Sequence, residues 1–208
     1  AADDQARGFD LSSPPLMRFT LVRLGDNRYQ LIWTYHHLLL DGWSASRLLG
    51  EMLRLYAHQA LPALTGRYAD YIHWLAQQDV TLAEGFWRAR LETLQAPTML
   101  ANAANTGGSG HGVLYSYLDS EATRRLYTFA TQQRVTLNTL VQAAWLLLLQ
   151  RHTGQRSVAF GATVAGRPTQ LPGAQDMLGL FINTLPVIQT LDPQQTLGDG
   201  LRESQDFN

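Results

Sequence analysis

The chain has 208 residues, of which 45% are hydrophobic and 16% charged, and its formal net charge is -1. These values are typical of a soluble globular protein of one or two domains, and the absence of a basic block argues against nucleic-acid binding. The 16 basic residues are all Arg and Cys is absent, which excludes lysine and thiol nucleophiles, disulfides and Cys-based metal sites.

Residues 29–35 alternate and carry aromatic and β-branched side chains, which predicts a strand. Ser44 is predicted to cap a helix that ends near His58. Two more helices are predicted at 68–77 and 81–94. The first of these three helices has an apolar face of five residues that we expect to be buried: Leu48, Leu49, Met52, Leu53 and Tyr56.

Residues 95–112 contain mainly Ala, Asn, Thr, Gly and Ser without a periodic apolar face, which indicates an interdomain linker. A short strand is predicted at 113–118. Asp119 and Ser120 then supply a cap for a helix that continues through Arg134.

The next helix is predicted at 137–151 and ends at Gly154. Its expected buried side consists of Leu140, Val141, Ala144, Trp145 and Leu148. Strands at 157–164 and 181–189 follow, separated by a Gly-Arg-Pro turn at 166–168 and a loop, and a last helix is predicted at 196–207. Strands and helices alternate in each half, which indicates an α/β fold in two lobes.

Two adjacent histidines, His36 and His37, and the carboxylate of Asp41 lie between strand 29–35 and the helix that follows. If the strand continues through the histidines, their side chains point to opposite faces, so we expect one structural and one reactive histidine. Two further interpretations are a metal site, which lacks enough ligands with suitable spacing, and a pair of hydrogen-bonded core residues. The following helix start directs N–H groups and its positive dipole end toward the histidines, which favours acyl or proton-transfer chemistry.

Residues 36–44, His-His-Leu-Leu-Leu-Asp-Gly-Trp-Ser, resemble the HHxxxDG signature of the condensation domains of nonribosomal peptide synthetases. Other segments resemble further motifs of this family in the same order. They are residues 9–11 with 15–18, residues 68–74, residues 136–145, residues 160–168 and residues 179–186. These matches extend over nearly the whole chain.

The resemblance implies an α/β fold with two chloramphenicol-acetyltransferase-like lobes in a V and a tunnel between them. Residues 1–94 would be the later part of the N-terminal lobe, 95–112 the linker and 113–208 the first part of the C-terminal lobe. We therefore expect a domain that is incomplete at both ends, cut from a longer polypeptide and inactive by itself.

The resemblance also implies an amide-forming acyltransferase. Donor and acceptor peptidyl carrier proteins would bring their phosphopantetheine arms into the tunnel, and the acceptor amine would attack the donor thioester. The domain itself would bind no cofactor, and an adenylation domain would be its neighbour. We expect a cytoplasmic protein without a membrane partner, because the longest apolar run is far shorter than the ~20 residues of a transmembrane helix.

His37 is the expected catalytic residue, either as the proton acceptor or as the group that positions the amine. Gly42 is expected to donate its N–H to the developing oxyanion. His36 and Asp41 would support the motif. Asp41 could also be the base, but the resemblance favours a carboxylate paired either to an Arg in the missing amino-terminal part or to one such as Arg18. Asn183 is expected either to contact a pantetheine arm in the tunnel or to be a hydrogen-bonded turn residue. Ser44 is also expected at the tunnel, and Trp43 in the core.

Four alternatives to this function stay open. An epimerization domain has a similar fold and histidine motif, although Trp43 and residues 179–186 look more like a condensation domain. A glycerolipid acyltransferase shares the H-x4-D spacing of His36 and Asp41. Ser44 suggests a serine hydrolase, but the G-x-S-x-G elbow is missing. A catalytically silent domain that recruits partner proteins is the fourth alternative.

Overall fold

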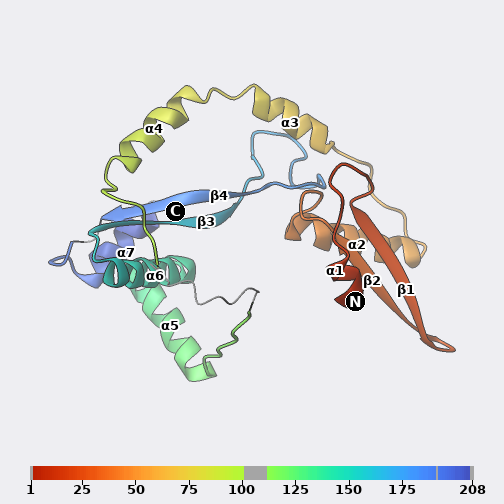
Figure 1. Ribbon diagram of the computed structural model, residues 1–208, viewed down its shortest axis with the longest axis horizontal. Helices are drawn as coiled ribbons and strands as arrows, with labels where there is room; N and C mark the ends of the chain where they lie inside the picture. Colours follow the sequence, from red (N-terminus) through yellow and green to blue (C-terminus); the bar gives the residue numbers. More distant parts are fainter. Residues whose placement is uncertain (1, 101–111, 191, 207–208) are drawn as a thin grey trace. The chain divides into compact units, whose positions relative to one another are not determined.

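Figure 1 shows a computed structural model of the protein, which describes residues 2–100, 112–190 and 192–206. In chain order, its elements are α1 (Ala2–Ala6), β1 (Met17–Gly25), β2 (Arg28–Tyr35), α2 (Gly42–Tyr56), α3 (Tyr68–Ala76), α4 (Thr81–Leu91), α5 (Ser120–Gln133), α6 (Leu137–Thr153), β3 (Ser157–Ala165), β4 (Ile182–Thr190) and α7 (Leu197–Asp206). This mixture of helices and strands confirms the predicted α/β class. Within the described ranges, no helix is long and apolar enough to cross a membrane.

The chain forms two compact units, which are described separately. Unit 1 contains residues 1–78 and 163–183, and unit 2 contains residues 79–162 and 184–208. The segment 163–183 therefore packs with residues that precede it by more than a hundred positions. The predicted lobes, 1–94 and 113–208, stay a prediction, because residues 101–111 of the expected linker lie outside the described residues.

In unit 1, β1 and β2 form an antiparallel hairpin, with Met17 opposite Tyr35 and Leu21 opposite Leu31. The predicted strand 29–35 is confirmed as β2, whereas β1 was not predicted. The hairpin places the end of β2 beside the chain that enters β1. The N–H of His36 donates to the carbonyl of Leu16 at 2.9 Å, which fixes the backbone just before the histidine turn.

Helix α2 begins directly after this turn, but the prediction of its buried face was wrong. Leu49, Leu53 and Tyr56 are exposed, and the only fully buried side chain of α2 is Ser44. Leu48 and Met52 are half-buried and line an apolar groove with residues of the hairpin, among them Trp33. In the described part of unit 1, the hairpin thus covers only one side of α2.

Helix α3 confirms the helix predicted at 68–77, and its first turn carries two aromatic side chains that pack on segment 163–183. The ring centres of Tyr68 and Tyr71 lie 5.3 and 4.6 Å from the ring centre of Phe181. The Tyr68 hydroxyl also donates to the carbonyl of Leu180 at 2.8 Å. These contacts fix the end of the segment within unit 1.

Strands β3 and β4 pair in a two-stranded sheet, and most of both strands, residues 157–162 and 184–190, belongs to unit 2. The hydroxyls of Ser157 and Thr190 hydrogen-bond at 2.7 Å, and Gly161 lies beside Thr184, so the two strands run antiparallel. Both strands, as well as α7, agree with the elements predicted at 157–164, 181–189 and 196–207. Phe207, the last residue of the predicted helix, lies outside the described residues.

The core of unit 2 lies around α6. Leu146 and Leu149 pack on Val158 of β3, whereas Ala143 packs with residues of α5 and α7. The predicted buried side of α6 was wrong except for Leu140, which packs against this core. Residues 143–149 are apolar all around the helix, so the hydrophobic period does not identify one buried face.

In unit 2, capping residues were the most reliable sequence signals for the ends of helices. Asp119 caps α5 by accepting the N–H of Ala122 at 2.7 Å, as predicted. Gly154 ends α6 with φ 70°, also as predicted, because this left-handed conformation is accessible to glycine. The strand predicted at 113–118 was wrong: these residues form no helix or strand, because a strand needs a partner for its backbone groups.

Candidate active site

The two histidines lie in a turn between β2 and α2. Since β2 ends at Tyr35, the strand does not continue through them, and strand alternation is not what separates their side chains. Nδ1 of His36 accepts the N–H of Leu38 at 3.1 Å, and its half-buried ring meets the edge of Phe9. An imidazole nitrogen that accepts an N–H carries no proton, so the proton of neutral His36 is on Nε2.

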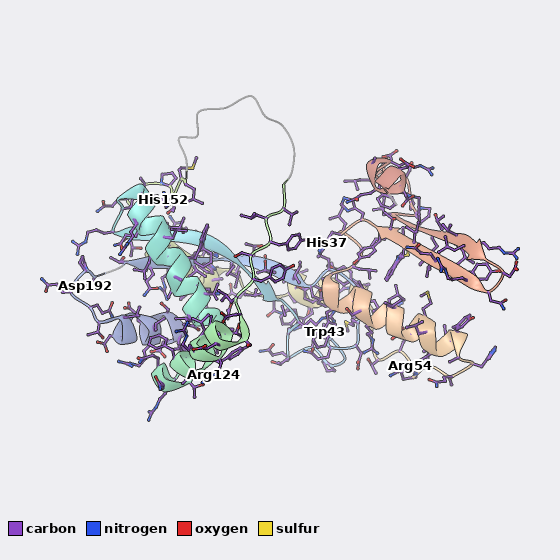
Figure 2. The ribbon with its side chains drawn as sticks, turned by 90° about the horizontal axis from the view of Figure 1, so that it is seen from below. His37, Trp43, Arg54, Arg124, His152 and Asp192 are labelled. Carbon is purple, nitrogen blue, oxygen red and sulfur yellow. The ribbon has the colours of Figure 1, made fainter. Side chains whose placement is uncertain are left out.

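His37 differs from its neighbour because its side chain is exposed (Figure 2). Within the described residues, no side chain or backbone group hydrogen-bonds its imidazole. Both ring nitrogens are therefore available to a ligand in unit 1. The turn thus contains one fixed histidine and one accessible histidine. The structural and reactive roles expected for them stay a prediction.

Asp41 is the buried polar centre of unit 1, with 1% of its surface exposed. Its Oδ1 caps α2 by accepting the N–H of Ser44 at 2.8 Å. Its Oδ2 accepts the N–H of Phe181 at 3.0 Å. These bonds hold the carboxylate between the start of α2 and the end of segment 163–183.

The Arg that faces Asp41 is Arg167, whose Nη2 lies 3.6 Å from Oδ1. The candidate considered from the sequence, Arg18, pairs with Asp4 at 3.0 Å instead. Burial raises the pKa of the Asp41 carboxyl, but the N–H groups of Ser44 and Phe181 and the Arg167 guanidinium outweigh burial and lower this pKa below its usual value. At neutral pH, Asp41 is therefore an ionised carboxylate and a weak base.

Arg167 belongs to the Gly-Arg-Pro turn that follows β3, and it is almost completely buried. Its Nη1 donates to the carbonyls of Ala174 and Met177 at 2.5 and 2.8 Å, and its guanidinium lies 4.0 Å from the centre of the Phe181 ring. Burial lowers the pKa of Arg167, and the Asp41 carboxylate partly offsets this effect. Through these bonds Arg167 holds the backbone of the loop 166–177, and its positive charge lies next to Asp41.

Ser44 was expected to cap α2 and to line a tunnel, and the structure gives it neither place. The cap is Asp41, three residues earlier, because α2 begins at Gly42. The side chain of Ser44 is 0% exposed, so it has no surface in unit 1 that could line a tunnel. Its hydroxyl instead contacts Gly179 and Arg167.

Gly42 is the exposed first residue of α2, and a Cβ at this position would meet no atom within 4 Å. Space is therefore open beside a helix N-terminus, where N–H groups without a helical partner carry a partial positive charge. Trp43 was expected in the core, and this was wrong: 59% of it is exposed. Its indole N–H donates to the carbonyl of Gln175 at 3.3 Å, and the guanidinium of Arg167 lies 5.9 Å from the centre of its ring.

Asn183 is an exposed residue at the start of β4, and its contact with a pantetheine arm stays a prediction. No group of three or more His, Asp or Glu side chains is arranged to hold a metal ion in the part of the chain that the structure describes. The site therefore consists of an exposed imidazole, an accessible helix start and a buried Asp-Arg pair. This arrangement can position a nucleophile and stabilise a developing negative charge.

The chain is similar to known proteins over almost its whole length. The family model of the condensation domain matches residues 1–207. One of the linear gramicidin synthase proteins of Brevibacillus parabrevis is 40% identical over 214 residues, covering 99% of this chain and 3% of that protein. Chondramide synthase cmdD of Chondromyces crocatus is 42% identical over 212 residues, covering 99% of this chain and 5% of that protein.

Two solved structures share the fold at low sequence identity. The first condensation domain of the calcium-dependent antibiotic synthetase aligns with a TM-score of 0.71 and 22% identity, covering 99% of this chain and 48% of that one. A four-domain nonribosomal peptide synthetase bound to AMP and glycine aligns with a TM-score of 0.76 and 23% identity, covering 98% of this chain and 16% of that one. The chain thus spans about half of that solved condensation domain and a small part of the curated synthetases.

Proposed function

The chain belongs to the condensation-domain family of nonribosomal peptide synthetases, and we propose that it contributes the catalytic histidine turn to amide-bond formation between two thioesters. The donor is an aminoacyl or peptidyl thioester and the acceptor is an aminoacyl thioester. The observation that carries this proposal is the exposed His37 in a turn that leads directly to the open helix start at Gly42.

In the proposed reaction, the nitrogen of the acceptor amine attacks the carbonyl carbon of the donor thioester. The C–N bond forms, the C–S bond breaks, and the donor arm leaves as a thiol. His37 hydrogen-bonds the attacking nitrogen, takes its proton and returns a proton to the leaving sulfur. The N–H of Gly42 stabilises the negative charge that develops on the carbonyl oxygen.

The position of the amine contributes more to the rate than its deprotonation. General-base help typically supplies ~10²–10⁴-fold, whereas the orientation of two tethered reactants reaches effective molarities of ~10⁵–10⁸ M. His37 therefore acts first as the group that places the amine. Asp41 is assigned the supporting role, since its lowered pKa makes it a poor proton acceptor.

Carrier proteins would supply both reactants on phosphopantetheine arms, and the domain would need no cofactor of its own. We place the chain in two chloramphenicol-acetyltransferase-like lobes arranged in a V, with the reaction in the tunnel between them. An adenylation domain would act as a neighbour in the same synthetase. The multidomain composition of the matched four-domain synthetase supports this context.

The proposal is tested with the full domain and its two carrier proteins, each loaded with an aminoacyl group. Mass spectrometry of the acceptor carrier should show one added donor acyl group joined by an amide bond. Inversion of the donor stereocentre without transfer of an acyl group would identify an epimerization domain instead. Carrier binding without either reaction would identify a silent recruiting domain.

A further inference from the structure

The hydroxyl of Ser44 is completely occupied by hydrogen bonds to segment 163–183. It donates to the carbonyl of Gly179 at 2.8 Å and accepts the N–H of the same residue at 3.1 Å. It also accepts Nη2 of Arg167 at 2.8 Å. A hydroxyl has one donor and two acceptor sites, so each site of this buried group has one partner.

Asp41 holds the same stretch from the preceding turn of the chain. Its N–H donates to the carbonyl of Gly179 at 3.2 Å, and its carboxylate accepts the N–H of Phe181. Asp41 and Ser44 thus hold residues 179–181 from the start of α2. We call this set of contacts the Gly179 clasp, made by Asp41, Ser44, Arg167 and residues 179–181.

The other side of the clasp is closed by an aromatic ring. A Cβ at Gly179 would overlap the ring of Tyr68, whose hydroxyl is fixed on the carbonyl of Leu180. The backbone of Gly179 therefore cannot move away from Ser44 without displacing Tyr68. The clasp is a closely packed junction within unit 1.

Gly42 and Trp43 lie between Asp41, the cap of α2, and Ser44, the two residues that hold residues 179–181. We propose that Ser44 is a positioning residue, whose hydroxyl sets the orientation of the first turn of α2 and of the histidine turn before it. This inference rests on the proposed function, because the groups that it orients are His37 and the N–H of Gly42. Ser44 acts through these groups and does not touch the reactants.

Unit 2 offers a matched control for the loss of a buried hydroxyl. Ser204 is 5% exposed, and the one proton of its hydroxyl is shared between Oε1 of Gln189 at 2.6 Å and the carbonyl of Gly200 at 2.9 Å. Ser204→Ala, like Ser44→Ala, removes a buried hydroxyl, but from a position outside the candidate site. A general loss of stability affects both variants, whereas a positioning effect appears only at Ser44.

The first test measures backbone amide exchange in the protein, which requires no substrate. Ser44→Ala should increase the exchange rates of residues 36–43 and 179–181 about tenfold, because it removes hydrogen bonds that keep this junction closed. Ser204→Ala should leave both segments at their wild-type rates. Wild-type exchange of both segments in Ser44→Ala would overturn the proposal, whatever reaction the protein catalyses.

The second test measures amide formation by the full domain with loaded carrier proteins. Ser44→Ala should lower kcat by about 10²-fold with unchanged KM for both carriers, since a displacement of about 1 Å at reacting groups has an effect of this size. Ser44→Cys, which fills the site but bonds weakly, should also lower kcat, and Ser204→Ala should not. Wild-type kcat in Ser44→Cys would overturn the positioning role. If the wild-type protein forms no amide, the proposed function is contradicted instead. The exchange test would then still show whether Ser44 holds the first turn of α2 and the histidine turn.

Discussion

The carboxylate of Asp41 accepts the backbone N–H of Phe181, a residue 140 positions later in the chain. The same carboxylate caps α2 through the N–H of Ser44. One buried side chain therefore joins the histidine turn to the segment that follows β3. Removal of its charge should affect unit 1 more than removal of a charge at the surface.

Asp41→Asn keeps the shape of the side chain but leaves the guanidinium of Arg167 buried without a counter-charge. We expect it to lower the free energy of unfolding by about 3 kcal/mol, measured by urea unfolding. The control is Asp26→Asn, because the side chain of Asp26 is 99% exposed and its ion-pair partner among the described residues is Arg23 at the surface. The control should change stability by less than ~1 kcal/mol. Equal losses in the two variants would contradict the structural role of Asp41.

The contribution of Asp41 to stability should depend on pH in a defined direction. Burial opposes ionisation, but the hydrogen bonds and Arg167 outweigh it, so the pKa of Asp41 is lower in the folded protein than the ordinary value of 3.8. A lowered folded pKa gives a contribution that is complete above the unfolded pKa and is lost as the pH falls through the folded pKa.

The measurement for this prediction is the difference in unfolding free energy between wild type and Asp41→Asn. It should stay constant from pH 7 to about pH 5 and decrease below about pH 4. Other carboxylates are unchanged in both proteins and cancel. A difference that already decreases between pH 7 and pH 5 would show that the folded pKa is raised.

Two glycine substitutions should have opposite effects on stability. Gly179→Ala places a Cβ against the ring of Tyr68, and such overpacking costs about 1–3 kcal/mol. Gly50→Ala adds a Cβ in the interior of α2, where no atom lies within 4 Å, and it should stabilise the protein by about 0.5–1 kcal/mol. Thermal unfolding of both variants tests the pair. A neutral Gly179→Ala would show that the clasp tolerates a side chain.

Two leucines of α6 test its corrected orientation. Leu146 is 0% exposed and Leu148 is 41% exposed, although the sequence placed Leu148 on the buried side. Leu146→Ala should lower the unfolding free energy by about 2–5 kcal/mol because it leaves a cavity. Leu148→Ala should cost clearly less in the same urea titration. The reverse order would support the face predicted from the sequence.

Local signals were sufficient for most elements of this fold. The cap at Asp119 and the glycine at Gly154 located the ends of α5 and α6 because they act on neighbouring residues. Strand β1, which was not predicted, also has a local signal, since residues 17–21 alternate between apolar and polar side chains and the chain turns at Asp26 and Asn27. The opposite error occurred at 113–118, where alternation without a pairing partner did not produce a strand.

The candidate site was only partly accessible to the same reasoning. The motif identified His37 and Asp41, but the partner of Asp41 depends on how segment 163–183 packs with unit 1. Ser44 and Arg167 are 123 residues apart, and no hydrophobic period records such a contact. The burial of Ser44 follows from this long-range contact. Because the contact leaves no local signal, the sequence alone predicted a cap and a tunnel position for Ser44.

The central claim is that His37 positions the acceptor amine, and the most direct measurement is the rate of amide formation by His37→Ala. The assay uses the full domain with loaded carrier proteins. The control variant is His73→Ala, which removes another exposed imidazole, whose hydrogen-bond partner among the described residues is the carbonyl of Ala69. His37→Ala should lower kcat by at least ~10²-fold, because a displacement of about 1 Å of the amine has an effect of this size. It should not lose stability, and His73→Ala should retain the wild-type rate. A wild-type rate for His37→Ala would contradict the claim.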